Sequence, residues 1–247
     1  MATLVHTAHA QPPGVTTLTL DSPANRNALS AGLVAELRAA LAAAAADPGT
    51  RTVVLTHTGT TFCAGADLKS PCDPADFLAL LREIAALSKP VVGRVTGHVR
   101  AGGLGLLGVC DIAAAGAGST YAFTETHLGV VPAVISAPML ALLDPRAASR
   151  YLLTAEAFDA AEAARIGLLT LHGDDVDEVL APVLAGLRKA GPEALAATKR
   201  LVTAGLRTAL ERDGAALAEL SARHFASAEA REGITARFER RDPSWAL

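Results

Sequence analysis

A glycine-rich stretch at residues 95–113, VTGHVRAGGLGLLGVCDIA, constrains the fold of this chain more than any other segment. It continues a strand-like apolar run, VVGRVTG, and it places glycines at positions 102, 103, 105 and 108. Glycine lets a backbone turn sharply and approach its neighbours closely. The segment therefore predicts a buried strand, a tight turn and a short, closely packed helix.

Residues 103–108 spell G-x-G-x-x-G, which allows three interpretations. A dinucleotide-binding turn would hold a pyrophosphate at a helix start and would need an acidic residue about 20 positions later, where Glu125 is loosely available. That unit usually opens a domain, whereas this one follows two strand–helix passages. In the second interpretation the glycines serve close helix packing alone. The third involves another turn of the chain.

A second glycine turn, FCAGADLK at residues 62–69, also follows a predicted strand. Both turns have small residues at positions where a ligand oxygen could approach the backbone. Two backbone N–H groups that converge from separate turns form an oxyanion hole, which stabilises negative charge on an oxygen. The third interpretation is therefore an oxyanion site built from both turns.

The rest of the chain alternates strands and helices for about its first 170 residues. TLVHTA and VTTLTLDS flank QPPG and predict a hairpin. Ser30 and Asp73 are predicted helix caps, and Asp47-Pro48-Gly49 ends the first helix. Beyond residue 132 the pattern is helical, and from about residue 175 it predicts three helices. We expect a core at residues 1–180 and a helical region at 181–247.

Charge and cysteine content exclude several classes of function. The net charge of −3 and scattered basic residues argue against nucleic-acid binding. The chain has three cysteines, an odd number, and no two of them form a C-x-x-C motif. Neither a disulfide framework nor a metal site is therefore expected. We find no signal-peptide pattern and no apolar run that could span a bilayer. These features predict a cytoplasmic protein without a membrane partner.

Five stretches in order resemble the crotonase, or enoyl-CoA hydratase/isomerase, superfamily over essentially the whole chain. They are SPANRNALS, FCAGADLK, the segment KPVVGRVTGHVRAGGLGLLGVCDIA, YAFTETHLGVVP and EAREGITARFERRDPSW. Each stretch is moderately specific, and the ordered set is strong. The resemblance favours the oxyanion interpretation and makes the G-x-G-x-x-G coincidental.

The resemblance implies an α/β fold: a ββα spiral with two roughly perpendicular sheets and a C-terminal helical region that serves trimerisation and covers the coenzyme A site. It implies an acyl-CoA substrate, no further cofactor, and a homotrimer or a dimer of trimers. The apolar residues of segment 70–87 and those after Pro132 would line an aliphatic acyl pocket. Fold alone cannot choose among the reactions that this superfamily performs.

The resemblance also implies roles for individual residues. The N–H groups of Ala66 and Gly102 would hold the thioester oxygen. The other candidates for binding coenzyme A are Arg26, Ala64, Asp67, Leu68 and Phe238. For Arg26 and Phe238 the alternatives are a solvated arginine and ordinary helix packing. Asp67 is expected to order its loop through Asx-type hydrogen bonds, and Cys63 and Cys110 are expected in the core.

The expected catalytic carboxylate is Glu125, and the chain departs from the family at Gly105. Similar hydratases carry a second glutamate at the position of Gly105. Hydration needs a base for water and an acid for C2, and one carboxylate can serve both if it returns the proton. His98 or His127 could supply a second group, although a structural role is the simpler interpretation for each. The segment ETHLGVVPAVIS is similar to methylglutaconyl-CoA hydratase-like proteins, where a glycine is not unusual.

Three functions therefore remain open. The leading hypothesis is an acyl-CoA lyase of fatty acid metabolism that hydrates a 2-enoyl-CoA to a 3-hydroxyacyl-CoA, with Glu125 as both acid and base. The alternative is a 3,2-enoyl-CoA isomerase that uses Glu125 alone. A further alternative is a catalytically silent acyl-CoA-binding scaffold. Acyl chain length, branching and pathway are not readable from the sequence.

Overall fold

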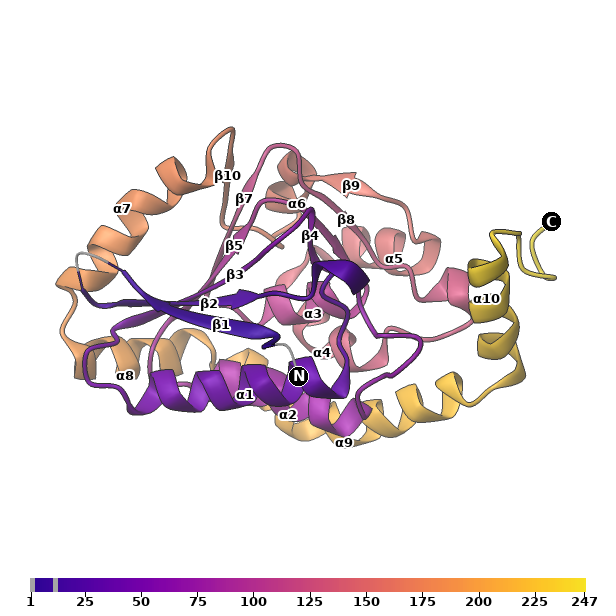
Figure 1. Cartoon of the computed structure of the whole chain (residues 1–247), viewed down its shortest axis with the longest axis horizontal. Helices are drawn as coiled ribbons and strands as arrows, with labels where there is room; N and C mark the ends of the chain where they lie inside the picture. Colours follow the sequence, from indigo (N-terminus) through magenta and orange to yellow (C-terminus); the bar gives the residue numbers. More distant parts are fainter. Residues whose placement is uncertain (1–2, 11–12) are drawn as a thin grey trace.

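The computed structural model describes residues 3–10 and 13–247, and two β-sheets surrounded by helices make up this part of the chain (Figure 1). The larger sheet has the order β1-β2-β3-β5-β7-β10, and the smaller has the order β4-β6-β8-β9. The α/β class expected from the sequence is confirmed. The strands are β1 Val5–His9, β2 Val15–Leu20, β3 Thr52–His57, β4 Thr61–Cys63, β5 Val91–Val95, β6 His98–Arg100, β7 Ile112–Gly116, β8 Thr120–Ala122, β9 Phe158–Asp159 and β10 Leu171–Gly173.

The N-terminal hairpin forms as predicted. Strands β1 and β2 pair antiparallel, with Val5 opposite Leu20; Gln11 and Pro12 of the predicted turn lie outside the described residues. From β2 onward the larger sheet is parallel. Parallel sheets are covered on both faces, and every residue of β3 is accordingly buried. Helix α1 (Ala31–Ala46) contacts β1 and β2, whereas α7 (Val176–Lys189) contacts β3 and β7 and covers a smaller apolar cluster.

The predicted helix caps are present. The Ser30 hydroxyl accepts a hydrogen bond from the Leu33 N–H at 3.2 Å, and the Asp73 carboxylate accepts one from the Ala75 N–H at 2.8 Å. Such caps satisfy N–H groups that have no acceptor within the helix. The helices of the first 170 residues are α1 Ala31–Ala46, α2 Pro74–Ala86, α3 Gly102–Gly108, α4 Ala133–Leu142, α5 Pro145–Thr154 and α6 Ala160–Arg165, with short 3-10 turns η1 Pro23–Asn25 and η2 Thr126–Leu128.

Four short strands are not predicted by the sequence. β4 and β6 lie in the two segments interpreted as turns, the residues of β9 fall in a predicted helical piece, and no strand is expected at β10. Each has only two or three residues, too few for an alternating pattern. They are strands because of their partners: Tyr121 of β8 lies opposite Phe158 of β9, and Ala114 of β7 lies opposite Leu171 of β10.

Residues 175–247, all of which are described, form four helices where three were predicted. They are α7 Val176–Lys189, α8 Pro192–Val202, α9 Ala204–Phe225 and α10 Ala228–Glu239. The expected single C-terminal helix is wrong because α9 ends at Phe225 and Ser227 caps the start of α10, where its hydroxyl accepts a hydrogen bond from the Ala230 N–H. A further break at Thr203 separates α8 from α9. The division of the chain at residue 180 stays a prediction, and α7 runs across it.

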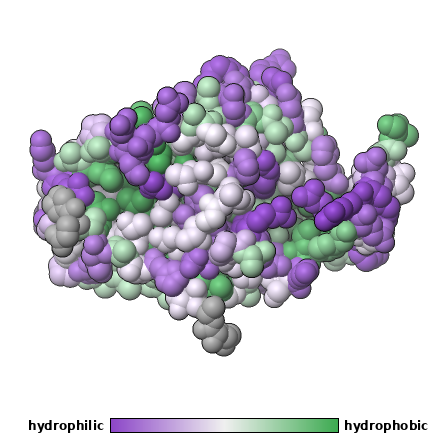
Figure 2. All heavy atoms as spheres, turned by 45° about the horizontal axis from the view of Figure 1, so that its top comes forward, coloured by the Kyte–Doolittle hydropathy of each residue, from purple (hydrophilic) through white to green (hydrophobic). Residues whose placement is uncertain are grey.

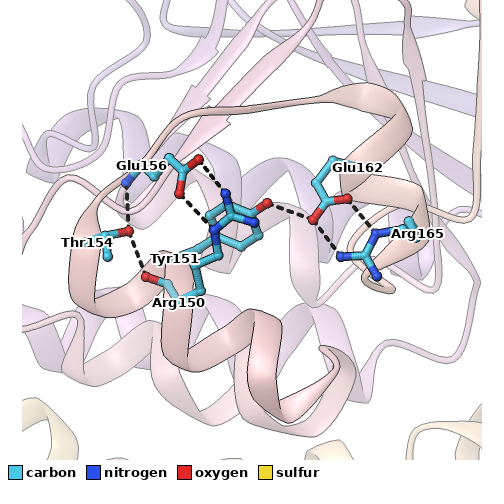
Figure 3. A network of polar contacts seen from close by, with 6 residues as sticks. All are labelled: Arg150, Tyr151, Thr154, Glu156, Glu162 and Arg165. Atoms are coloured by element: carbon cyan, nitrogen blue, oxygen red, sulfur yellow. Dashed lines mark hydrogen bonds and ion pairs between the residues drawn. The ribbon is translucent and has the colours of Figure 1, made fainter.

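A polar network fastens α5 to α6 (Figure 3). The Tyr151 hydroxyl donates to Glu162 at 2.6 Å, and Arg165 pairs with the same carboxylate. The ring of Tyr151 also lies against Phe158 of β9, with 4.3 Å between ring centroids. These contacts hold the short strand β9 at the edge of the smaller sheet.

One buried ion pair attaches α8 to the body of the molecule. The Lys199 ammonium lies 2.7 Å from the Asp111 carboxylate, and both side chains are at least nine-tenths buried. The ammonium also donates to the carbonyl oxygens of Ile84 and Lys89, and the carboxylate accepts the Val91 N–H. Removal of one partner from such a pair leaves an uncompensated buried charge.

We predict that Lys199→Met lowers the free energy of unfolding by about 3–5 kcal/mol, because Asp111 would remain buried without its cation. Chemical denaturation measures this change. The matched control is Arg212→Met, which breaks the exposed pair with Asp213 and should leave stability unchanged within error. Equal effects of the two substitutions would contradict a stabilising role for the buried pair.

Candidate active site

Two turns meet at the ends of neighbouring strands. Strands β4 and β6 pair in parallel, so the residues that follow them emerge at the same edge of the sheet. Gly65 follows β4 with φ of +88°, and a Cβ atom placed on it would lie 2.7 Å from the Ala101 Cβ and 3.4 Å from the Gly102 nitrogen. Only glycine fits here, because both the conformation and the contact exclude a side chain.

Four backbone N–H groups at this junction have no acceptor within the described part of the chain: those of Gly65, Ala66, Gly102 and Gly103. Other nearby N–H groups are occupied, since the Ala64 N–H donates to Arg26, the Asp67 N–H to Leu29 and the Ala101 N–H to Ala122. Ala101 has φ of +48° and ψ of −123°, a conformation uncommon for alanine. The Ala66 and Gly102 groups named from the sequence are among the four, and their role as an oxyanion hole stays a prediction.

Glu125 lies on the same cavity as these turns. It follows β8, the strand next to β6, and immediately precedes η2. Its side chain is buried, and among the described residues Oε2 has no hydrogen-bond partner. Burial raises the pKa of this carboxyl to about 7, because a charged group loses solvation inside the protein. A pKa near neutrality suits a group that both accepts and donates a proton.

A cavity of about 1100 Å³ brings the predicted site residues together. All of these line it: Arg26, Ala64, Ala66, Asp67, Leu68, Gly102, Glu125 and Phe238. His98 and His127 line it too, as do Phe77 of the predicted acyl segment and Val134 after Pro132. Gly105 does not reach the wall. The volume lies at the upper end of ordinary ligand pockets.

The loop after the first turn is held by Asp67. Its carboxylate accepts the Lys69 N–H at 2.9 Å, the Ser70 N–H at 3.2 Å and the Asn25 side-chain amide at 2.9 Å. Burial by itself would raise the pKa of Asp67, but these hydrogen bonds outweigh it and lower the pKa. The expected Asx-type arrangement is present, and it occupies the oxygens of this carboxylate.

The glycines of α3 allow close packing. A Cβ on Gly103 would lie 2.8 Å from Cys63, one on Gly105 would lie 2.4 Å from Ile135, and one on Gly108 would meet Met139. Cys63 is fully buried and its pKa is raised to about 12 by burial, in keeping with a core role. Cys110 is also packed against the core.

The sequence predicted that the C-terminal helical region covers the coenzyme A site, but Phe238 is the one residue of that region that it named. Helix α10 contacts η2, and Arg237, Arg241 and Trp245 line the cavity. On the face shown in Figure 2, a band of hydrophilic side chains runs toward the α10 end at the right. Arg241 is paired with Glu232 and Glu239. The helix cap at Ser227 is the sequence signal that would have indicated this part of the wall, because the break there lets α10 turn back toward η2.

Within the described ranges, no group of three or more His, Cys, Asp or Glu residues is arranged to hold a metal ion. None of the helices in these ranges is long and apolar enough to cross a membrane.

The buried Glu125 predicts a pH dependence of stability. Its folded pKa of about 7 lies above the ordinary 4.5. The free-energy cost of burying the charged carboxylate in the folded state is therefore absent below pH 4.5, grows between pH 4.5 and 7, and is complete above pH 7. The full difference corresponds to roughly 3 kcal/mol. Glu125→Gln should therefore gain stability over the wild type at pH 8 relative to pH 5. Denaturant titration at both pH values measures this, and an equal difference at both would contradict the raised pKa.

Comparison with known proteins agrees with this geometry. The family model described as enoyl-CoA hydratase/isomerase matches residues 10–246. The crystal structure of an enoyl-CoA hydratase from Mycobacterium avium has a TM-score of 0.93 and 46% identity, with 100% of both chains covered.

Two curated relatives have more specific names. The crotonyl-CoA hydratase of Syntrophomonas wolfei is 29% identical, with 91% of each chain covered. The 2,3-dehydroadipyl-CoA hydratase of Escherichia coli is 28% identical, with 92% of this chain and 93% of the relative covered. By its sequence, its two-sheet architecture and its structural neighbours, this chain belongs to the enoyl-CoA hydratase/isomerase family and has the crotonase fold.

Proposed function

We propose that the protein hydrates a 2-enoyl-CoA to a 3-hydroxyacyl-CoA, with Glu125 as both base and acid. The observation on which this rests is one buried carboxyl, without a partner among the described residues, on the cavity that also contains the free N–H groups of Ala66 and Gly102. The names of the hydratase relatives support the reaction class.

The reaction conserves one proton. The Glu125 carboxylate takes a proton from water while the water oxygen bonds to C3. The C2–C3 π electrons move toward the thioester, whose oxygen becomes an enolate stabilised by the N–H groups of Ala66 and Gly102. The enolate then re-forms the carbonyl as C2 takes the proton back from Glu125. The net change is addition of water across the double bond.

Coenzyme A binding is proposed for the remaining cavity residues. Ala64, Ala66 and Leu68 offer backbone groups on one loop, and Asp67 fixes the shape of that loop through its hydrogen bonds. Arg26 is exposed at the rim and suits a phosphate. Phe238 of α10 is 54% exposed, so its ring is available to cover a bound nucleotide or pantetheine chain.

Isomerisation of a 3-enoyl-CoA is the second candidate, favoured by the absence of a carboxylate at Gly105. Glu125 would remove a proton from C2, which sends electrons to the thioester oxygen and forms a dienolate. Return of that proton to C4 leaves the double bond between C2 and C3. One carboxylate is sufficient for this shift, and no water is consumed.

We also propose a trimer or a dimer of trimers in the cytoplasm. Exposed leucines on α4 and α5, Leu140 and Leu153, are 65% and 74% accessible in the single chain and support burial against another copy. The three cysteines are free, which supports a reducing compartment. Light scattering on the purified protein measures the assembly.

The first test of function pairs two substrates, crotonyl-CoA and trans-3-hexenoyl-CoA, with products separated by chromatography. Glu125→Gln should lower kcat by about 10²–10⁴ on whichever substrate turns over. The matched control is Glu178→Gln, a substitution of an exposed residue of α7, and its kcat should equal that of the wild type. Hydration of crotonyl-CoA supports the leading proposal, and isomerisation without hydration supports the alternative. An unchanged Glu125→Gln rate would contradict both.

A second test removes one proposed oxyanion donor. Replacing the amide that joins Gly65 to Ala66 by an ester deletes the Ala66 N–H and should lower kcat by about 10²–10³. Because that N–H has no acceptor within the described residues, thermal stability should be retained. The control is an ester at Ala64, whose N–H donates to the Arg26 carbonyl at 3.1 Å; this change should lower stability instead. Full activity of the Ala66 ester would count against the oxyanion role.

A further inference from the structure

Gly105 and Ile135 occupy one volume from two helices. Gly105 is on α3 and Ile135 is on α4, and the two helices are in contact. A Cβ atom placed on Gly105 would lie 2.4 Å from the Ile135 Cγ2, 3.0 Å from its Cβ and 3.5 Å from its Cα. The Ile135 side chain therefore fills the space into which any side chain at position 105 would extend.

This shared volume belongs to the cavity wall. Residues three apart on a helix lie on the same face, so a side chain at 105 would extend from the face of α3 that carries Gly102. Gly102, Ile135 and Glu125 all line the cavity, whereas Gly105 is buried beneath. Ile135 thus presents an apolar surface where a side chain from α3 would otherwise enter.

Two further glycines of α3, Gly103 and Gly108, differ from Gly105 in what surrounds them. A Cβ on Gly103 would be 2.8 Å from the Cys63 carbonyl oxygen, which belongs to the backbone of β4. A Cβ on Gly108 would meet the terminal methyl of Met139, which is a fully buried core residue. At Gly105 the obstacle is instead a side chain that itself lines the cavity, as Leu29 is at Gly102.

We propose that Ile135 is a specificity-determining residue: by filling the side-chain volume of position 105, it leaves Glu125 as the sole acid/base carboxyl at the reacting end. This inference rests on the proposed role of Glu125. Two other carboxylates line the cavity: three N–H donors occupy that of Asp67, and Asp242 is exposed in the segment after α10. The Gly105–Ile135 pair consequently favours reactions that return the same proton, and it sets the ratio of hydration to isomerisation.

The geometry dictates how to reverse this arrangement. Ile135→Ala would keep a Cβ 3.0 Å from the new Cβ, whereas Ile135→Gly leaves the Cα at 3.5 Å, an ordinary contact distance. The test variant is therefore Gly105→Glu combined with Ile135→Gly. Its matched control is Gly105→Gln with Ile135→Gly, which has the same size and no carboxylate.

Initial rates on crotonyl-CoA and trans-3-hexenoyl-CoA are measured for both double variants and for Ile135→Gly alone. The Glu-containing double variant should hydrate crotonyl-CoA at least about 10-fold faster than its Gln control, because a second carboxylate can activate water while Glu125 protonates C2. Its ratio of hydration to isomerisation should rise by a similar factor. Equal hydration rates for the two folded double variants would overturn the proposal.

If the Glu variant does not fold, a smaller substitution, Gly105→Ala, tests the shared volume in two backgrounds. Gly105→Ala should lower the melting temperature in the wild type and should not lower it in the Ile135→Gly background. Equal losses in both backgrounds would overturn the packing argument. A wild type silent on both substrates would instead count against the proposed function. In that case a gain of hydration by the Glu variant over its Gln control supports the inference, and no gain overturns it.

Discussion

The close contact between the turns after β4 and β6 is the constraint on which the site depends. Gly65 has no side chain and a positive φ, so the backbone of Ala101 and Gly102 can approach it within van der Waals distance. The parallel pairing of β4 with β6 brings the two turns to one edge. A side chain at Gly65 would separate the N–H groups of Ala66 and Gly102, whatever residues surround them.

The buried Lys199–Asp111 pair and the buried Glu125 carboxyl differ in whether an opposite charge lies beside them. Lys199 and Asp111 stabilise each other by direct contact, and backbone groups bind both the Lys199 ammonium and Asp111 Oδ2, whereas Asp111 Oδ1 has no partner among the described residues. Glu125 has no such partner in the described part of the protein, and its pKa rises as a result. The first arrangement attaches a helix, while the second stores an unfavourable charge at a cavity. Perturbed carboxyl groups in cavities are often functional for this reason.

The features that sequence predicted best are local. Ser30 and Asp73 cap helices because a hydroxyl or carboxylate near a helix start has nearby N–H groups to accept. The family motifs predicted eight residues that do line one cavity. What the sequence could not show depends on distant partners: β9 and β10 are strands only beside β8 and β7, and Gly105 is paired with Ile135 only because α4 packs on α3. The cap at Ser227 was local and readable, and it was missed because the flanking residues all favour helix.

The cavity wall includes residues from both ends of the chain, Arg26 near the start and Trp245 two positions before the last residue. During synthesis the strands and turns that carry Glu125 emerge from the ribosome well before α10 does. A nascent chain can therefore fold its sheets while the cavity is still open on the side of η2. The wall on the side of η2 is therefore complete only once α10 and the residues after it, as far as Ala246, have joined the sheets that carry Glu125.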